Sequence, residues 1–229
     1  MKPLLKIVLV LWLFFTSILI LLKVTGLVTV EKIKLWIEMA EEADPTYAAL
    51  AVAGLLFVDL FIAIPSTTVT LLGGYFLGPV YGAIAAFTGL LLAGTTGYGI
   101  SRRYGDSLLN FLIRNEEKRA EAVELFRTHG AVVVLLSRAM PLLPEVSACM
   151  AGMTRMPFAK FLLAWVVSTA PYAMIASYAG SVSTVENPLP AILAVIGLTG
   201  FFWLGGFVIK KRNDGKQRDG DLQSEASRV

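Results

Sequence analysis

Long runs of apolar residues, each bounded by charged or turn-forming residues, divide this chain of 229 residues. The runs cover residues 7–22, 48–64, 83–100, 131–153, 158–180 and 189–209. A helix of about 20 mostly apolar residues is long enough to cross the hydrocarbon of a bilayer. The pattern therefore predicts an all-α polytopic membrane protein.

The amino-acid composition supports a membrane protein and argues against a disulfide or a zinc site. Hydrophobic residues make up 56% of the chain and charged residues 16%, and the mean hydropathy is +0.69. Soluble domains have apolar residues near half and charged residues near a quarter, so an ordinary soluble domain is excluded. A single cysteine, Cys149, and a single histidine, His129, provide neither an internal disulfide nor a zinc ligand cluster. We expect no metal, no cofactor, no catalytic residues and no nucleic-acid partner.

The distribution of basic residues constrains the topology. Lys2 and Lys6 place the N-terminus in the cytoplasm, and the six Arg and Lys residues of segment 101–128 should also be cytoplasmic, as should residues 210–212. If every apolar run crossed once, segment 101–128 would lie outside. The conflict disappears if segments 48–79 and 131–157 enter and leave on the same side. The charges thus predict four crossings and two re-entrant hairpins, with both termini cytoplasmic.

Both predicted hairpins contain residues that break helices inside a bilayer. Such breaks are tolerated where protein or a water-filled cavity satisfies the freed backbone groups. The first hairpin has a proline and a glycine pair in its interior, and the second has two prolines and a glycine. The residues expected to form the turns and their packing are Pro65, Gly73, Gly74, Pro79, Pro141, Pro144, Gly152 and Pro157.

The two hairpins match each other in sequence. GYFLGP at 74–79 and GMTRMP at 152–157 are both G-x4-P, and each leads into a predicted span. A proline lies nine residues before Gly74 and eight before Gly152, and an ionisable residue lies fifteen and fourteen residues before them. Two units that enter from opposite sides of the membrane are the inverted-repeat design of many transporters. We predict such a repeat here.

The repeat pairs Asp59 with Arg138, near the tips of the two hairpins, and Glu145 is a third candidate just past Pro144. A charge at the middle of a span costs about 2.5–3.5 kcal/mol on insertion scales, so it persists where it faces a partner or a polar interior. One interpretation is a pair that holds the hairpins together. The other, which we favour, is a polar crossing point where Arg138 attracts a phosphate and Asp59 or Glu145 exchanges a proton.

Four motifs in this order identify a resemblance. They are G-x-x-x-G-P-x-x-G at 74–82, YGISRRYG at 98–105, R-x-x-P-x-x-P at 138–144 and AGMTRMPFAKFLL at 151–163. This order resembles the DedA-like, or VTT-domain, membrane proteins over about residues 48–180. It is most similar to the Tvp-type branch, the SNARE-associated Golgi protein homologues. The resemblance implies two facing re-entrant hairpins and lipid flipping or scrambling, and some members are described as proton-dependent carriers of undecaprenyl phosphate.

Carried over by position, the resemblance places the family's membrane acid on Asp59 and its re-entrant arginine on Arg138. Its cytoplasmic basic motif falls on Arg102 and Arg103. Bacterial members commonly have a second acid where this chain has threonines 67 and 68, and a second arginine where it has a proline. Glu145 lies outside the family pattern. These departures leave the substrate open.

The prediction is therefore a multi-pass protein of the bacterial inner membrane, not an enzyme, that moves a lipid as a flippase or scramblase, with coupling to protons as an option. The alternatives are an ion- or proton-coupled carrier of a small solute and a membrane-organisation factor that does not transport. Membrane lipids are the expected partners, and a homo-oligomer remains open. Residues 1–25 should form an uncleaved first helix, because no small-x-small cleavage site follows the first run.

The expected organisation continues with an interfacial amphipathic segment at 26–47 and a core at 48–180. Within the core we expect re-entrant segments at 48–79 and 131–157, spans at 82–100 and 158–180, and a cytoplasmic helix at 101–128. A last helix should cover 189–209, followed by a disordered cytoplasmic tail at 210–229.

Overall fold

The computed structural model describes residues 8–14, 16–17, 20, 30–62, 64–112, 115–139, 143–183, 189–190, 192–194, 196–197 and 200. Throughout these residues the regular structure is helical and no strand occurs, which confirms the predicted all-α class. The runs at 7–22 and 189–209 lie partly outside the described residues. Pro141 and the tail at 210–229 lie wholly outside them.

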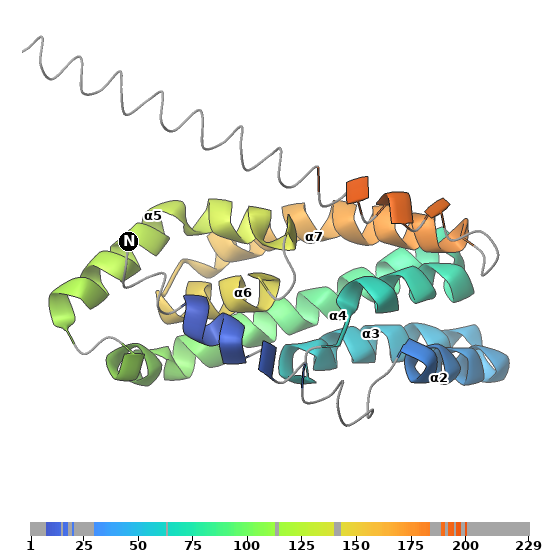
Figure 1. The fold of residues 1–229 in the computed structure, drawn as a ribbon, viewed down its shortest axis with the longest axis horizontal. Coiled ribbons are helices and arrows are strands. Elements are labelled where there is room, and N and C mark those ends of the chain that lie inside the picture. The colour runs from blue at the N-terminus through green and yellow to red at the C-terminus, as the bar shows by residue number, and fades with distance from the viewer. Residues whose placement is uncertain are drawn as a thin grey trace, which may run out of the picture.

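The helices pack around one long central element (Figure 1). Helix α4 contacts α3 along one side and α6 and α7 along the other, and α5 packs against α6 and α7. The elements are α2 (Val30–Ala43), α3 (Pro45–Ile62), α4 (Ser66–Leu112), α5 (Glu116–Leu136), the 3-10 turn η1 (Ser137–Ala139), α6 (Leu143–Met153) and α7 (Phe158–Ser181).

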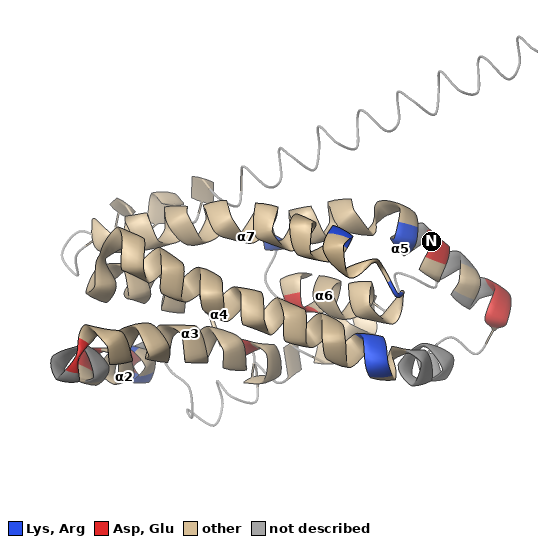
Figure 2. Ribbon diagram, turned by 180° about the vertical axis from the view of Figure 1, so that it is seen from behind, with Lys and Arg blue, Asp and Glu red and all other residues tan. Residues whose placement is uncertain are grey.

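Three of the described helices are long and apolar enough to cross a membrane. They are Pro45–Ile62, Ser66–Gly105 and Phe158–Ser181, with mean hydropathies of 1.9, 1.8 and 1.4. Charged positions are rare along their lengths and gather at the ends of the bundle (Figure 2). Large apolar side chains on their outer surfaces, such as Tyr81 and Leu163, are exposed, as is expected for a protein whose outside faces lipid. The chain is an integral membrane protein.

Helix α4 is interrupted at Gly78, whose backbone has φ 77° and ψ 176°. This combination is open essentially only to glycine, and the following Pro79 lacks the N–H that a continuous helix needs. Proline is at the same time well suited to the first position of a new helix. The interruption therefore divides α4 into an arm of 12 residues, 66–77, and a longer helix that begins at Pro79.

A second interruption separates α6 from α7. The chain turns at residues 154–157, where Arg155 takes a left-handed conformation with φ 54°. The hydroxyl of Thr154 donates to the carbonyl of Met150 at 2.8 Å, and α7 begins directly after Pro157. Both helix breaks thus fall on the two G-x4-P motifs.

The charged segment 101–128, expected as a single connecting helix, differs from that expectation. Helix α4 continues through residues 101–112, and α5 begins anew at Glu116. Two glutamates in its first turn, Glu116 and Glu117, favour a helix start because negative charge is stabilised at a helix N-terminus. Residues 98–105 (YGISRRYG) therefore continue the preceding span and do not start a separate element.

Glycines bring the two units into close and reciprocal contact. A Cβ at Gly74, on the short arm of α4, would overlap the backbone of Ser177 on α7. In the same way, a Cβ at Gly152, on α6, would overlap the backbone of Tyr98 on the long part of α4. Small residues allow such backbone approach between membrane helices. Each short helix therefore packs on the long helix of the other unit.

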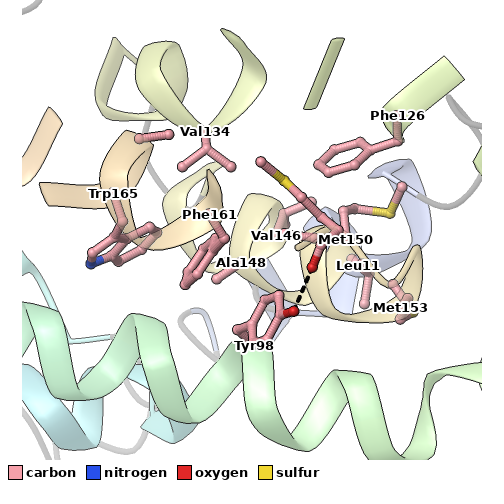
Figure 3. Packing of buried hydrophobic residues seen from close by; sticks show 13 residues of the cluster. Leu11, Tyr98, Phe126, Val134, Val146, Ala148, Met150, Met153, Phe161 and Trp165 are labelled. Atoms are coloured by element: carbon pink, nitrogen blue, oxygen red, sulfur yellow. Dashed lines mark hydrogen bonds between the residues drawn. The ribbon is translucent and has the colours of Figure 1, made fainter. Parts of the chain in front are cut away.

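Two buried apolar clusters stabilise the bundle at its two ends. One is centred on Tyr98, Phe161 and Trp165 and extends to Phe126 and Met150 (Figure 3). The other joins α2 to α3, α4 and α7. Within it, Ile33 and Ile37 of α2 are fully buried. They belong to the apolar face expected for the amphipathic segment, whose remaining described side chains are mostly exposed.

Candidate functional site

Asp59 lies in the last turn of α3 and is 4% exposed. Its carboxylate accepts a hydrogen bond from the backbone N–H of Ile64, on the other side of the short connection to α4. The connection between α3 and α4 is short, and Pro65 immediately precedes α4. The carbonyl of Pro65 accepts from the Val69 N–H at 3.1 Å, which closes the first turn of α4. A buried carboxylate is thereby held at the point where the chain reverses.

Arg138 lies in the 3-10 turn η1 that follows α5. Its Nη2 donates to Oγ1 of Thr169 at 3.2 Å, and its guanidinium carbon lies 5.2 Å from the Trp165 ring centroid and 4.9 Å from that of Tyr172. Arginine over an aromatic face is stabilised by cation–π attraction. The Nε atom is buried and has no hydrogen-bond partner.

Glu145 lies in the first turn of α6, after the buried Pro144, and is 9% exposed. Its Oε2 atom is buried without a hydrogen-bond partner. The charges of Asp59, Arg138 and Glu145 act on one another electrostatically. The three ionisable residues predicted from the sequence, which lie on α3, η1 and α6, are therefore close enough to interact electrostatically.

The three charged groups are close but do not form a closed ion pair. Among the described residues, no ion pair within 4.0 Å joins Arg138 to Asp59 or Glu145. An uncompensated polar atom in a buried site carries a desolvation cost of about 1–3 kcal/mol, and more if it is charged. The free Nε of Arg138 and the free Oε2 of Glu145 thus leave one donor and one acceptor for another molecule.

Hydroxyl groups at the start of α4 lie next to Tyr172. The phenol of Tyr172 donates to Oγ1 of Thr67 at 2.9 Å, and the hydroxyl of Thr70 donates to the carbonyl of Ser66 at 2.8 Å. Ser66, Thr67 and Thr70 belong to the start of α4 and are here called the hydroxyl turn. In the sequence analysis, residues 67 and 68 were noted as the position where related bacterial proteins commonly have a second acid. Their neighbour Tyr172 was not foreseen.

The aromatic and hydroxyl partners of Arg138 were also missed, although a signal for them existed. Trp165, Thr169 and Tyr172 follow one another at intervals of four and three residues, which places them on one face of a helix. All three are buried, and Trp165 is fixed by the bond from its Nε1 to the carbonyl of Leu90 at 3.1 Å. A search for polar and aromatic residues at helical spacing would have grouped the three on one face of α7, but it would not have shown that this face contacts Arg138.

The remaining described turn and packing residues lie at the helix breaks and helix crossings. Pro79 and Pro157 start the helices that follow the two breaks, and Gly74 and Gly152 lie at the helix crossings described above. A Cβ at Gly73 would meet the side chain of Val52 on α3 at 3.0 Å, so this glycine allows the short arm of α4 to approach α3.

The basic motif lies at a different place, near the turn between α6 and α7. Arg102 donates to the hydroxyl of Tyr98 and, at 3.4 Å, to the carbonyl of Met156. The hydroxyl of Tyr98 donates to that same carbonyl, a bond drawn as a dashed line in Figure 3. Arg103 lies over the ring of Tyr104 at 6.0 Å. Arg102 therefore ties the long part of α4 to the second helix break and does not contact Arg138.

Comparison with known proteins assigns the family. Residues 64–182 match the VTT domain. The chain is 32% identical over 179 residues to an uncharacterized membrane protein, slr0232, of Synechocystis, an alignment that covers 69% of this chain and 82% of the relative. It is 29% identical over 190 residues to undecaprenyl phosphate transporter A of Bacillus subtilis, which covers 72% of this chain and 89% of the relative. No solved structure matches. The chain belongs to the VTT-domain, or DedA, family of membrane proteins.

Proposed function

We propose that this protein transports a lipid with a phosphate headgroup across the membrane, through a polar site between two re-entrant hairpins. The observation that carries the proposal is the group formed by the buried Asp59 and Glu145 and the half-buried Arg138, in which Nε of Arg138 and Oε2 of Glu145 lack partners. A relative named as an undecaprenyl phosphate transporter supports a lipid phosphate as the substrate class.

One short arm in each hairpin supports the proposal, while α3, the other arm of the first hairpin, has 18 residues. The first arm of α4 has 12 residues and α6 has 11, which at 1.5 Å per residue gives about 18 and 16 Å. The hydrocarbon of a bilayer is about 30 Å thick, so neither arm is long enough to cross it. In this proposal α3 with the first arm of α4 forms one hairpin, and the end of α5 with η1 and α6 forms the other. The crossings are 7–22, 83–100, 158–180 and 189–209.

Arg138 would bind the headgroup, because a guanidinium matches the oxygen geometry of a phosphate. Asp59 and Glu145 would hold or exchange a proton as the anion enters, since a carboxylic acid is far less costly inside a membrane than a carboxylate. The lipid tail would stay in the bilayer while the headgroup passes the charged group. Transport in this proposal consists of binding and releasing the headgroup, without a covalent step.

Two other functions make different predictions. A carrier of a small solute would use the same charges but would not distinguish lipids by headgroup. A factor that only organises the membrane would retain its function when the charged group is neutralised. Flippase and scramblase mechanisms differ in whether net transport against a gradient requires a proton gradient.

A reconstitution experiment tests the proposal. Purified protein in liposomes would be supplied with a fluorescent prenyl phosphate or a fluorescent phosphatidylcholine, with and without a pH gradient. We expect prenyl phosphate to cross at a rate that Arg138→Ala abolishes. Arg127→Ala is the matched control, because Arg127 is exposed on α5 and forms a surface ion pair with Glu124 at 3.7 Å. Transport that persists in Arg138→Ala would refute this site.

The topology has its own test. In a chain with Cys149→Ala, single cysteines would be introduced at positions 41, 117 and 186 and labelled with an impermeant reagent. Position 117 should label only from the cytoplasmic side, and positions 41 and 186 only from the outside. Labelling of position 117 from outside would show that segments 48–79 and 131–157 both cross, and the hairpin proposal would be wrong.

A further inference from the structure

Three side chains on one face of α7 surround the guanidinium of Arg138. Trp165 and Tyr172 each present a ring to it, and Thr169 accepts a hydrogen bond from its Nη2 at 3.2 Å. Thr169 is fully buried and Trp165 and Tyr172 nearly so, which leaves the guanidinium little freedom to turn. With these contacts in place, the Nε–H of Arg138 is a buried donor that lacks an acceptor. We call Trp165, Thr169 and Tyr172 the α7 clamp.

Tyr172 differs from the other two members of the clamp because it contacts both units. Its ring lies under Arg138 of the second unit, and its hydroxyl donates to Thr67 of the first unit at 2.9 Å. Thr70 lies one turn further along the same helix, where its hydroxyl donates to the carbonyl of Ser66 at 2.8 Å. The guanidinium and the hydroxyl turn are therefore separated by a single side chain.

This arrangement suits an oxyanion. A guanidinium supplies a charged donor at a fixed angle, and hydroxyl groups supply donors that rotate to meet phosphate oxygens. Neutral donors add no charge that would need compensation in the bilayer interior. The hydroxyl turn is also the N-terminal turn of α4, where the backbone N–H groups and the helix dipole favour a negative charge.

We propose that Tyr172 determines headgroup specificity. Its ring holds the Nε edge of Arg138 toward the substrate, and its bond to Thr67 holds the hydroxyl turn as the opposite wall of a phosphate subsite. This inference rests on the proposed function and deepens it. The ligand of the subsite is the phosphate of a lipid, bound by Arg138 on one side and by hydroxyl groups on the other.

Substitutions can separate the two contacts of Tyr172. Tyr172→Phe keeps the ring under Arg138 and removes the bond to Thr67. Thr67→Val removes the same bond from the other side, and Tyr172→Leu removes both the bond and the ring. Tyr178→Phe is the matched control, because Tyr178 lies on the same helix and is 61% exposed.

Two measurements would be made on each variant. One is binding of geranylgeranyl phosphate in detergent, followed as a thermal shift, with geranylgeraniol and inorganic phosphate as the comparison ligands. The other is the rate of prenyl phosphate transport in liposomes as a function of its concentration. Since one hydrogen bond is worth about a two- to tenfold change in affinity, we expect Tyr172→Phe and Thr67→Val each to raise Kd and KM by that factor with kcat unchanged.

The double variant Tyr172→Phe/Thr67→Val should bind no more weakly than either single variant, because both lose the same bond. Tyr172→Leu should lower kcat as well, and Tyr178→Phe should change nothing. If Tyr172→Phe lowers only the unliganded melting temperature and leaves Kd and KM unchanged, Tyr172 is a structural strut and the inference is wrong. If inorganic phosphate shifts the melting temperature as much as the prenyl phosphate does, the subsite is not a lipid headgroup site.

The two proposals fail in different ways. Wild-type protein that binds geranylgeranyl phosphate through Tyr172 but does not move it refutes transport and supports the subsite. Wild-type protein that transports in an Arg138-dependent manner, with Kd unaffected in both hydroxyl variants, supports transport and refutes the subsite.

Discussion

The two units of the predicted repeat contribute different chemistry. The first unit is α3 with α4, and the second is the end of α5 with η1, α6 and α7. The first provides an acid, Asp59, and the hydroxyl turn, whereas the second provides a second acid, Glu145, together with Arg138 and the clamp that fixes it. The two units therefore make unequal contributions to the site, and the only cation among the three ionisable residues comes from the second unit.

The units also differ in how they interrupt their helices. The first break is a single residue, Gly78, in a backbone conformation that requires glycine, and the helix resumes at once. The second is a four-residue turn in which Arg155 occupies the left-handed region and Tyr98 and Arg102 bind the carbonyl of Met156. The second break is therefore stabilised by hydrogen bonds that the first does not need.

Substitutions of the charged residues Asp59 and Arg138 should have the largest effect. Asp59→Asn or Arg138→Ala should lower transport by about ten- to a hundredfold, because each removes a charged group proposed to bind the headgroup or the proton, and a hydrogen bond to a charged group contributes about 1.5–3 kcal/mol. The double exchange Asp59→Arg with Arg138→Asp should recover detergent thermal stability more than transport, since stability needs opposite signs and a headgroup site needs each sign in its own unit. Full transport by the exchanged protein would show that the pair is only structural.

The glycine crossings should come next. Gly74→Val and Gly152→Val each place a side chain against backbone of the other unit and should lower the free energy of unfolding by about 1–3 kcal/mol or more. Gly99→Val is the control on the long part of α4, where a Cβ meets no atom within 4 Å. Melting temperatures in one detergent compare the three variants. Equal tolerance at positions 74 and 99 would contradict the crossed packing.

The breaks themselves give a smaller effect that distinguishes the units. Gly78→Ala should destabilise the protein by about 1–3 kcal/mol although its Cβ would have open space, because the backbone there excludes other residues. Arg155→Gly should be neutral or stabilising by about 1 kcal/mol, since glycine adopts a left-handed conformation without strain. The melting temperature should thus fall in Gly78→Ala and stay the same or rise in Arg155→Gly. A similar loss at both sites would show that the breaks are equivalent.

The smallest predicted effect lies outside the membrane-spanning segments. The hydroxyl and then the backbone N–H of Thr46 hold the pKa of Asp44 below its ordinary value, and the N–H bond to Oδ1 is 2.7 Å long. A lowered folded-state pKa means that this stabilisation is present above about pH 4 and is lost as the pH falls through the folded pKa. Melting temperatures measured at neutral and acidic pH should fall less in Asp44→Asn, which retains a capping side chain, than in the wild type. An unchanged pH dependence would refute this role.

The sequence predicted the structure best where matching motifs or a residue with a special backbone conformation occur at recognisable spacings. Counting back from Gly74 and Gly152 paired Asp59 with Arg138, which the structure brings near each other with Glu145. The G-x4-P motifs likewise marked both helix breaks. These features depend on local spacing, and local spacing is visible in a single sequence.

The parts that could not be foreseen depend on which helix faces which. Nothing in the spacing of Trp165, Thr169 and Tyr172 says that their shared face meets Arg138 and not lipid, because apolar and aromatic residues occur on both kinds of surface. The continuation of α4 through Arg102 was also missed, since charge marks the membrane boundary but not the end of a helix. Crossing number and hairpin topology remain predictions.

The crossed packing at Gly74 has a consequence for how the protein is made. Its backbone partner, Ser177, follows roughly a hundred residues later, which takes a ribosome about 5–20 s to add at 5–20 residues per second. During that interval the first short helix has left the ribosome while the surface it packs against does not yet exist. The insertion machinery, the lipid or the neighbouring α3 must shelter its polar turn until the second unit arrives. The crossing at Gly74 can therefore form only after synthesis of α7, whereas both partners of the crossing at Gly152 already exist once α6 is made.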